Sequence, residues 1–232
     1  MYKHIVLNQP HASVEGLYDN QLSYWQINTD FINNVVIPWT DWHTDFLFNQ
    51  LQDVRIKRVR FPYSRFIVDA ERLWNDPLES VGQGIVYRQF GAHSRNVPKN
   101  IETRLKRLWQ WHQKQLVKTL QPDALLLDCH SFPSHLSDVD ICIGYNNDWS
   151  KPDDKTISKV ADMFDGYGYR VGVNNPYSNS ETPSCNFRYH SLMLEVNKKC
   201  YLRHRSIELH TLKHFKKPVQ DAVLLVQKEL LE

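Results

Sequence analysis

The sequence predicts an α/β fold, a single domain over residues 1–232 with a mixed, mostly parallel sheet flanked by helices. Three observations lead to this prediction. Apolar runs of strand length alternate with stretches of helical periodicity, which favours a sheet covered by helices. Some of these runs are continuously apolar, as in strands buried on both faces of a parallel sheet. The length of 232 residues suits one large domain or two small ones, and no repeat or linker divides the chain.

Six segments are predicted to be strands. Val54–Phe61 alternates apolar and basic residues, a pattern typical of a half-buried strand. Ala124–Leu127 and Val139–Ile143 are continuously apolar and are expected at the centre of the sheet. The other three are Ile5–Leu7, Tyr169–Val173 and Leu192–Val196.

Four segments are predicted to be helices. Asp41–Leu51 starts at a capping residue, Thr40 or Asp41 itself. Glu102–Leu120 carries an apolar stripe and stops before Pro122, and His112 on this helix is expected to face solvent. The other two run from Pro152 to Gly166 and from Pro218 onward.

Composition and charge exclude several classes of protein. Lys and Arg total 28 against 26 for Asp and Glu, a net charge of +2, which is too small for a protein that coats nucleic acid or a membrane surface. No apolar stretch is long enough to span a membrane, and the patch in MYKHIVLNQPHAS is too short for a signal peptide. Four widely spaced cysteines indicate reduced thiols, so a cytoplasmic location is expected.

Polar side chains follow the apolar runs of five of the predicted strands. In an open α/β sheet, ligands bind at the carboxyl ends of the strands, so these side chains are candidates for one site. They are His11 and Glu15, Arg65, Asp128 and His130, Asn174 and Tyr177, and Glu195.

This set contains the residue types of a catalytic zinc site. Two histidines and a carboxylate that leave one coordination position open can hold zinc, and a further Glu can act as general base. Alternatives stay open for each residue: His11 could cap a loop, and His130 could be a hydrogen-bonded structural residue. Glu195 ends an apolar run, so it is expected to be paired, metal-bound or raised in pKa.

Seven segments in a fixed order resemble the N-formylglutamate amidohydrolases, over roughly residues 5–205. The HS pair after a strand and the later Glu are also similar to zinc carboxypeptidases and aspartoacylase-like deacylases. The segments are PHAS at 10–13, TDWHTDFLF at 40–48, YSRFIVDAER at 63–72, LLLDCHS at 125–131, DICIG at 140–144, NNPY at 174–177 and LEVNKKCYL at 194–202.

The resemblance implies a zinc-carboxypeptidase-like fold and a Zn²⁺ cofactor. It implies zinc ligands at His11 and His130, with Asp45 or Glu15 as the third ligand. It also implies that Glu195 takes a proton from the attacking water and later returns it to the leaving amine.

The same resemblance implies a small N-acyl amino acid as substrate, with no nucleic-acid or membrane partner. Arg65 is the candidate for stabilising the oxyanion, and Arg65, Arg72, Asn174 and Tyr177 are the candidates for binding substrate. Arg88 is a further candidate cation, although ion pairing with a nearby carboxylate would equally account for Arg72 and Arg88.

The sequence departs from the family pattern at several positions, among them Ser13, which stands where the family usually has Gly. After Asp69 the family usually reads Asn-Arg and this chain has Glu71-Arg72, and after NNPY it has Ser-Asn-Ser where the family often has two glycines. A carboxypeptidase-like or other N-acyl-amino-acid hydrolase, or a binding protein with a degenerate site, is therefore the alternative. The basic and aromatic segment 104–111 could instead bind nucleic acid. The sequence leaves the oligomeric state undetermined.

Overall fold

The computed structural model describes residues 2–48, 51–202 and 217–232. The chain forms two compact units. The first contains Met1–Gln9, His43–Val59 and Leu116–Glu232, and the second contains Pro10–Trp42 and Arg60–Gln115. One domain over residues 1–232 stays a prediction.

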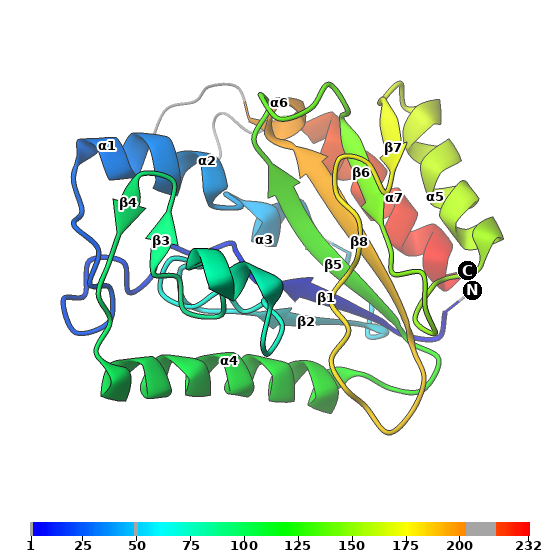
Figure 1. The fold of residues 1–232 in the computed structure, drawn as a ribbon. Coiled ribbons are helices and arrows are strands. Elements are labelled where there is room, and N and C mark those ends of the chain that lie inside the picture. The colour runs from blue at the N-terminus through cyan, green and yellow to red at the C-terminus, as the bar shows by residue number, and fades with distance from the viewer. Residues whose placement is uncertain (1, 49–50, 203–216) are drawn as a thin grey trace. The chain divides into compact units, whose positions relative to one another are not determined.

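The first unit is built on a six-stranded sheet in the order β2-β1-β5-β8-β6-β7 (Figure 1). Strands β1, β5 and β8 are parallel, β6 runs antiparallel to β8, and β7 runs parallel to β6. The mixed, mostly parallel sheet predicted from the sequence is therefore confirmed. The strands are β1 Ile5–Gln9, β2 Ile56–Arg60, β5 Leu125–Phe132, β6 Ile141–Gly144, β7 Val171–Val173 and β8 His190–Asn197.

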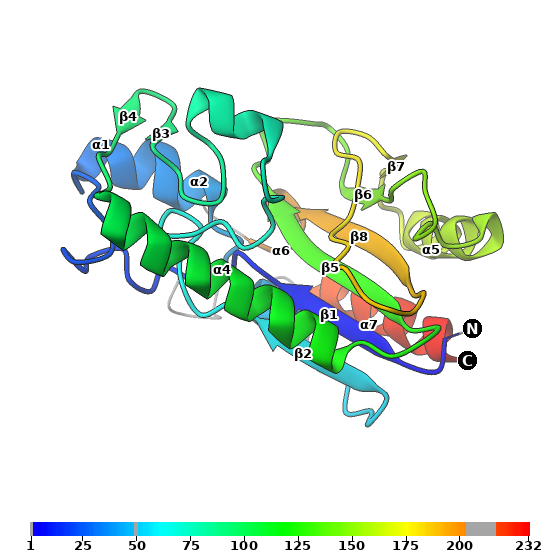
Figure 2. The same ribbon diagram turned by 60° about the horizontal axis from the view of Figure 1, so that its bottom comes forward.

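Helices α3, α5 and α7 cover one face of this sheet. Alternate strand residues such as Leu125, Leu127 and Cys129 pack with the helices in a single buried core. Figure 2 shows α7 running along one side of strands β1, β5 and β8. The helices of this unit are α3 Thr44–Leu47, α5 Asp154–Gly166, α6 Lys198–Tyr201 and α7 Lys217–Leu231.

The opposite face of the sheet has a smaller apolar core. Leu126 packs there with Leu116, near the end of α4 (Lys99–Thr119), and with Leu120, which directly follows that helix. Beyond these contacts, the same face carries the polar residues of β5 and β8. This sidedness follows from the two-residue repeat of a strand.

The second unit contains little sheet and is organised by loops around α4. Its short elements are α1 Thr29–Phe31, a π-helical turn at Ile32–Val36, α2 Ile37–Trp39, a 3-10 helix at Pro77–Val81, and the hairpin of β3 Gln89–Phe90 with β4 His93–Ser94. Buried Arg95 joins three of these loops, because its guanidinium donates to the carbonyls of Tyr87 at 2.5 Å, Ser23 at 2.5 Å and Ile67 at 3.0 Å. Its plane also lies over the Trp25 ring.

Two local predictions are wrong. The helix expected over Asp41–Leu51 is one turn, Thr44–Leu47, because His43 before it adopts a left-handed backbone conformation with φ 59°. His112, expected to face solvent, is fully buried and stacks edge-on against Phe61. His204, His210 and His214, in a basic stretch of the sequence where they are expected to face solvent, lie outside the described residues.

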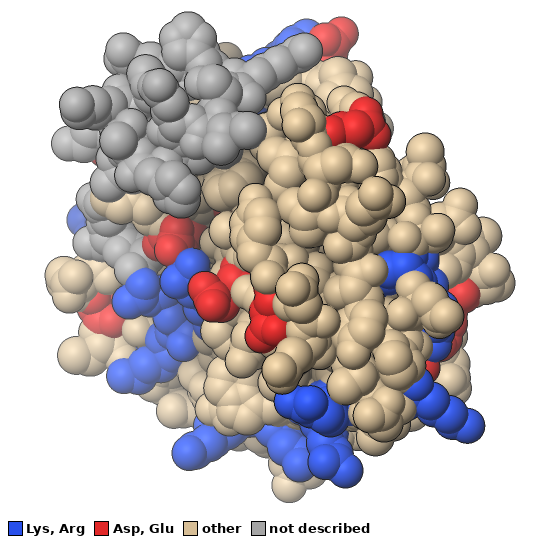
Figure 3. Space-filling model, turned by 90° about the vertical axis from the view of Figure 1, so that its left-hand side faces the viewer, with Lys and Arg blue, Asp and Glu red and all other residues tan. Residues whose placement is uncertain are grey.

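No helix in the described part of the chain is both long and apolar enough to cross a membrane. On the face drawn in Figure 3, Lys and Arg side chains form small groups separated by acidic and uncharged residues. All four cysteines are free thiols.

Candidate active site

In the first unit, His130 and Glu195 are register partners on the neighbouring parallel strands β5 and β8. Paired residues of adjacent strands point to the same face of a sheet, about 5 Å apart at Cα. Cys129 and Leu194, one residue earlier on each strand, point into the core beneath the helices. The histidine and the glutamate therefore share the opposite face. The sequence predicted that His130 directly follows a strand. In the structure it lies within β5.

Asp128 lies beside the His130 ring. This fully buried carboxylate accepts hydrogen bonds from Asn8 Nδ2 at 2.8 Å and from the Glu181 backbone N–H at 3.0 Å. His130 Nε2 lies 3.1 Å from its Oδ1 atom. A carboxylate beside one ring nitrogen is the usual way in which proteins fix the tautomer of a functional histidine.

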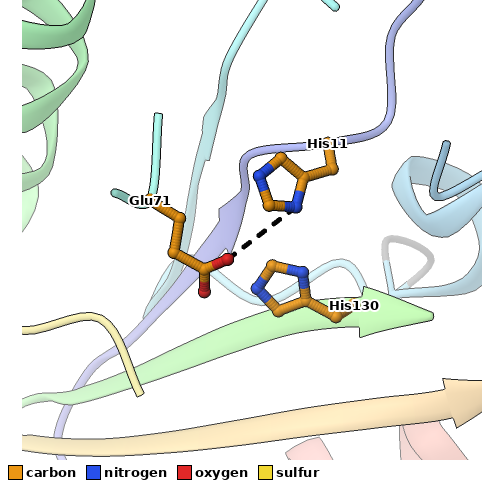
Figure 4. Close-up of side chains that lie close together, drawn as sticks. All are labelled: His11, Glu71 and His130. Atoms are coloured by element: carbon orange, nitrogen blue, oxygen red, sulfur yellow. Dashed lines mark ion pairs between the residues drawn. The ribbon is translucent and has the colours of Figure 1, made fainter. Parts of the chain in front are cut away.

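In the second unit, His11 lies among three carboxylates. Its Nε2 atom hydrogen-bonds to Asp69 Oδ1 at 2.8 Å, and its Nδ1 atom lies 3.7 Å from Asp41 Oδ2 and 3.8 Å from Glu71 Oε2. The dashed line in Figure 4 marks the His11–Glu71 ion pair. Burial and Arg65 lower the pKa of His11, but Asp69 and Asp41 raise it by more, so its net pKa is raised.

Asp69 lies at the centre of this arrangement. Its Oδ1 atom also accepts from the Glu71 backbone N–H at 3.1 Å. Its Oδ2 atom accepts from Arg65 at 3.0 Å and from the Tyr87 hydroxyl. Burial raises the pKa of Asp69, but His11 and Arg65 lower it by more, so the net pKa lies well below its usual range. Asp69 is therefore ionised, which keeps it an acceptor for all four donors.

Helix α4 positions the loop that carries Asp69 and Glu71. The Trp109 indole N–H donates to the carbonyl of Arg72 at 2.8 Å, and Gln113 donates to that of Ala70 at 3.0 Å. Trp109 also packs against the apolar core of this unit. These contacts give Trp109, one of the two tryptophans of segment 104–111, a structural role.

The other predicted site residues are distributed over both units. Asp45 is half-buried in the single turn of α3 and accepts from the Phe46 N–H, whereas Glu15 is exposed in a turn of the second unit. Exposed Asn174 accepts from the Tyr145 N–H, and Tyr177 stacks edge-on against Phe132. Arg88 forms an ion pair with Glu102 on α4 at 2.7 Å.

Sequence reasoning overlooked Asp41, Glu71 and Tyr87 as members of this arrangement. From its sequence context Asp41 is predicted only to cap a helix, and Glu71 only to depart from a motif or to pair with an arginine. The change from Asn to Glu at position 71, two residues after the acidic Asp69, was the available signal because it adds a potential metal ligand. No sequence pattern pointed to Tyr87.

The surroundings of His11 fit a metal ion. A histidine that ligates a metal almost always donates its other ring N–H to a carboxylate, as His11 Nε2 does to Asp69. Two ligand atoms about 2.0–2.1 Å from a tetrahedral zinc lie roughly 3.4 Å apart. The separations of 3.7 and 3.8 Å at Nδ1 are close to this value. Within the second unit, His11 and Glu71 are therefore candidate metal ligands, and Figure 4 draws their side chains.

The α/β fold recurs in solved structures. An N-formylglutamate amidohydrolase from Ralstonia eutropha JMP134 is similar with a TM-score of 0.75 and 16% identity, over 98% of this chain and 94% of that one. A gene product from Agrobacterium tumefaciens is similar with a TM-score of 0.62 and 11% identity, over 100% of this chain and 92% of that one. At these identities the likeness defines the fold alone.

The chain belongs to the N-formylglutamate amidohydrolase family, whose model matches residues 5–202. No curated protein matches the sequence. Family membership confirms the resemblance found in the sequence and indicates a hydrolase that acts on an amide bond.

Proposed function

We propose that this protein is a zinc-dependent amidohydrolase that removes the formyl group from N-formylglutamate, with His11, Glu71 and His130 as the metal ligands. The observation that carries the proposal is the pairing at His11: one ring nitrogen donates to a buried carboxylate, and the other faces Glu71 at a distance near that of two zinc ligands.

The sheet supports the inclusion of His130. Strand β1 pairs with β5 so that Asn8 is opposite Asp128, and the chain reaches His11 three residues after Asn8. His130 follows Asp128 by two residues on β5. The covalent chain and the strand register thus both favour a common site for the two histidines.

Zinc at this site would supply a Lewis acid that polarises the amide carbonyl and makes water more acidic. Glu195 is the proposed general base, which takes a proton from water and passes it to the leaving amine. Arg65 contributes positive charge toward the developing oxyanion, and Arg72 binds a carboxylate of the substrate. Asn174 and Tyr177 are proposed to contact the remainder of the substrate.

Metal analysis of the purified protein, with formate release from N-formylglutamate measured before and after chelation, tests the proposal. We expect about one zinc ion per chain, and activity that chelation removes and added zinc restores. A chain without zinc and without chelator-sensitive hydrolysis would contradict it. Zinc-dependent hydrolysis of other N-acyl amino acids, without formate release, would favour the carboxypeptidase-like alternative.

Three matched variants identify the third ligand. We expect Glu71→Gln to lower zinc affinity by at least tenfold, because it replaces an anionic ligand with a neutral amide. Asp45→Asn and Glu15→Gln make the same change at the two carboxylates that the sequence favoured, and they should retain zinc. Loss of zinc in Asp45→Asn or Glu15→Gln, with retention in Glu71→Gln, would instead identify Asp45 or Glu15 as the third ligand.

A further inference from the structure

Tyr87 lies at the centre of the polar contacts around Asp69, although the proposed reaction gives it no role. Its side chain is fully buried, with the ring stacked on Phe90 and edge-on to Phe66. Its hydroxyl donates to Asp69 Oδ2 and accepts from Arg65 at 3.2 Å and Arg72 at 3.3 Å. A hydroxyl has one donor and two acceptor positions, so all three are used.

The two arginines beside Tyr87 are held differently. Arg65 donates to Asp69, to the Tyr87 hydroxyl and, at 3.5 Å, to the Trp39 carbonyl. Among the residues that the structure describes, the Arg72 guanidinium donates one hydrogen bond, to Tyr87, and its Nε atom donates none. That Nε atom lies 3.7 Å from Asp69 Oδ2, and the side chain is 24% exposed.

Asp69 is fully occupied as an acceptor. His11 and the Glu71 N–H bind one oxygen, and Arg65 and Tyr87 bind the other. A carboxylate has about four such positions. Without the Tyr87 hydroxyl one position would open next to Arg72, and a guanidinium pairs strongly with a carboxylate in such a buried setting.

We infer that Tyr87 is a positioning residue for Arg72: its hydroxyl occupies the Asp69 oxygen that Arg72 would otherwise bind, and it leaves the Arg72 guanidinium available for an anionic group of the substrate. The inference rests on the proposed function, in which Arg72 binds the substrate carboxylate. Tyr87 contacts neither the substrate nor a metal ligand in this role.

The substitution Tyr87→Phe removes the hydroxyl and keeps the ring contacts. Tyr189→Phe is the matched control, since Tyr189 is also buried but donates its hydroxyl to the Pro183 carbonyl in the first unit. A first experiment needs no substrate: the rate at which phenylglyoxal modifies Arg72 is followed by peptide mass mapping. Pairing with Asp69 should protect Arg72 in Tyr87→Phe, by about threefold or more, and Tyr189→Phe should match the wild type. An unchanged or faster rate in Tyr87→Phe would overturn the inference.

A double-mutant cycle on N-formylglutamate hydrolysis separates positioning from general packing. We expect Tyr87→Phe to raise KM about tenfold, the size of one weakened hydrogen bond to a charged group, with kcat changed by less than about threefold. In an Arg72→Gln background the same substitution should change KM by less than about twofold, because the group that it positions is gone. Equal effects in both backgrounds would overturn the inference. If the wild type releases no formate, the proposed function fails, and the modification rates still decide the role of Tyr87.

Discussion

His130 and His11 each have a carboxylate partner, but they are held in place by different means. His130 lies inside β5, where the ladder to β8 places it opposite Glu195, and its partner Asp128 lies on the same strand. His11 lies in irregular chain after β1, and its partner Asp69 is 58 residues away in sequence. Backbone pairing therefore positions the first histidine, whereas side-chain contacts position the second.

This difference extends to the two units as a whole. The first unit, called the sheet unit below, depends on apolar contacts between strands and helices. Such contacts tolerate a change in a polar side chain at the sheet surface. The second unit, called the loop unit below, depends on buried polar groups that bridge separate loops, such as Arg95. We expect polar substitutions in the sheet unit to affect chemistry more than stability, and those in the loop unit to affect both.

The largest expected effect comes from Glu195→Gln in the sheet unit. Loss of the general base should lower kcat by roughly 10²–10⁴-fold. Zinc content and the free energy of unfolding should stay close to wild type, because the strand ladder is unchanged. Steady-state kinetics, metal analysis and urea denaturation measure the three quantities. Glu229→Gln, which breaks a surface ion pair with Lys159, is the control. Retained activity would remove Glu195 as the base.

In the loop unit, Arg95→Met should lower the free energy of unfolding by about 3–5 kcal/mol, because three buried carbonyls lose their donor. Urea denaturation followed by tryptophan fluorescence checks this value. Arg170→Met removes an exposed arginine that contacts Asp138 and Asp140 and should cost less than about 1 kcal/mol. A loss below about 1 kcal/mol for Arg95→Met would show that the loops are held by other contacts.

The same contrast explains what could be predicted from the sequence. Every strand of the main sheet was predicted, because an apolar run such as Ala124–Leu127 directly indicates a buried strand. His130 and Glu195 were anticipated because they follow such runs. Asp41 and Tyr87 were not, because their contacts depend on how loops far apart in sequence fold together. His112 was misjudged for a related reason: periodicity identifies the apolar stripe of α4 but not a histidine that packs against Phe61.

Asp69→Asn tests whether side-chain contacts position His11. The amide retains one acceptor oxygen and turns an NH₂ group toward donors, so at least one partner is lost. Outer-shell partners of metal-bound histidines typically contribute 10–100-fold in affinity, and we expect a loss of about this size in zinc binding. Competition with a chelator of known affinity measures it. Asp140→Asn, at a carboxylate of the sheet unit bound by Lys199 and the Arg170 N–H, should bind zinc like the wild type. Equal zinc affinity in both variants would contradict a positioning role for Asp69.

The smallest effect is the dependence of stability on pH that comes from His112 in the loop unit. Burial, and to a smaller extent His11, lower the pKa of His112 to about 3, against an ordinary value near 6.5 in the unfolded chain. Below pH 6.5 the unfolded state gains a proton that the folded state does not accept, so the stability contributed by His112 is full above pH 6.5 and is lost as the pH falls toward 3.

The loss from His112 approaches about 1.4 kcal/mol per pH unit. His112→Gln removes this titration. Between pH 6.5 and 5.0 the wild type should therefore lose about 1–2 kcal/mol more of its free energy of unfolding than the variant does. Urea denaturation at several pH values gives both slopes, and the comparison holds even if the variant is less stable throughout. Parallel slopes would mean that His112 takes up its proton in the folded state, and that the loop unit admits water at a position where the structure buries the ring.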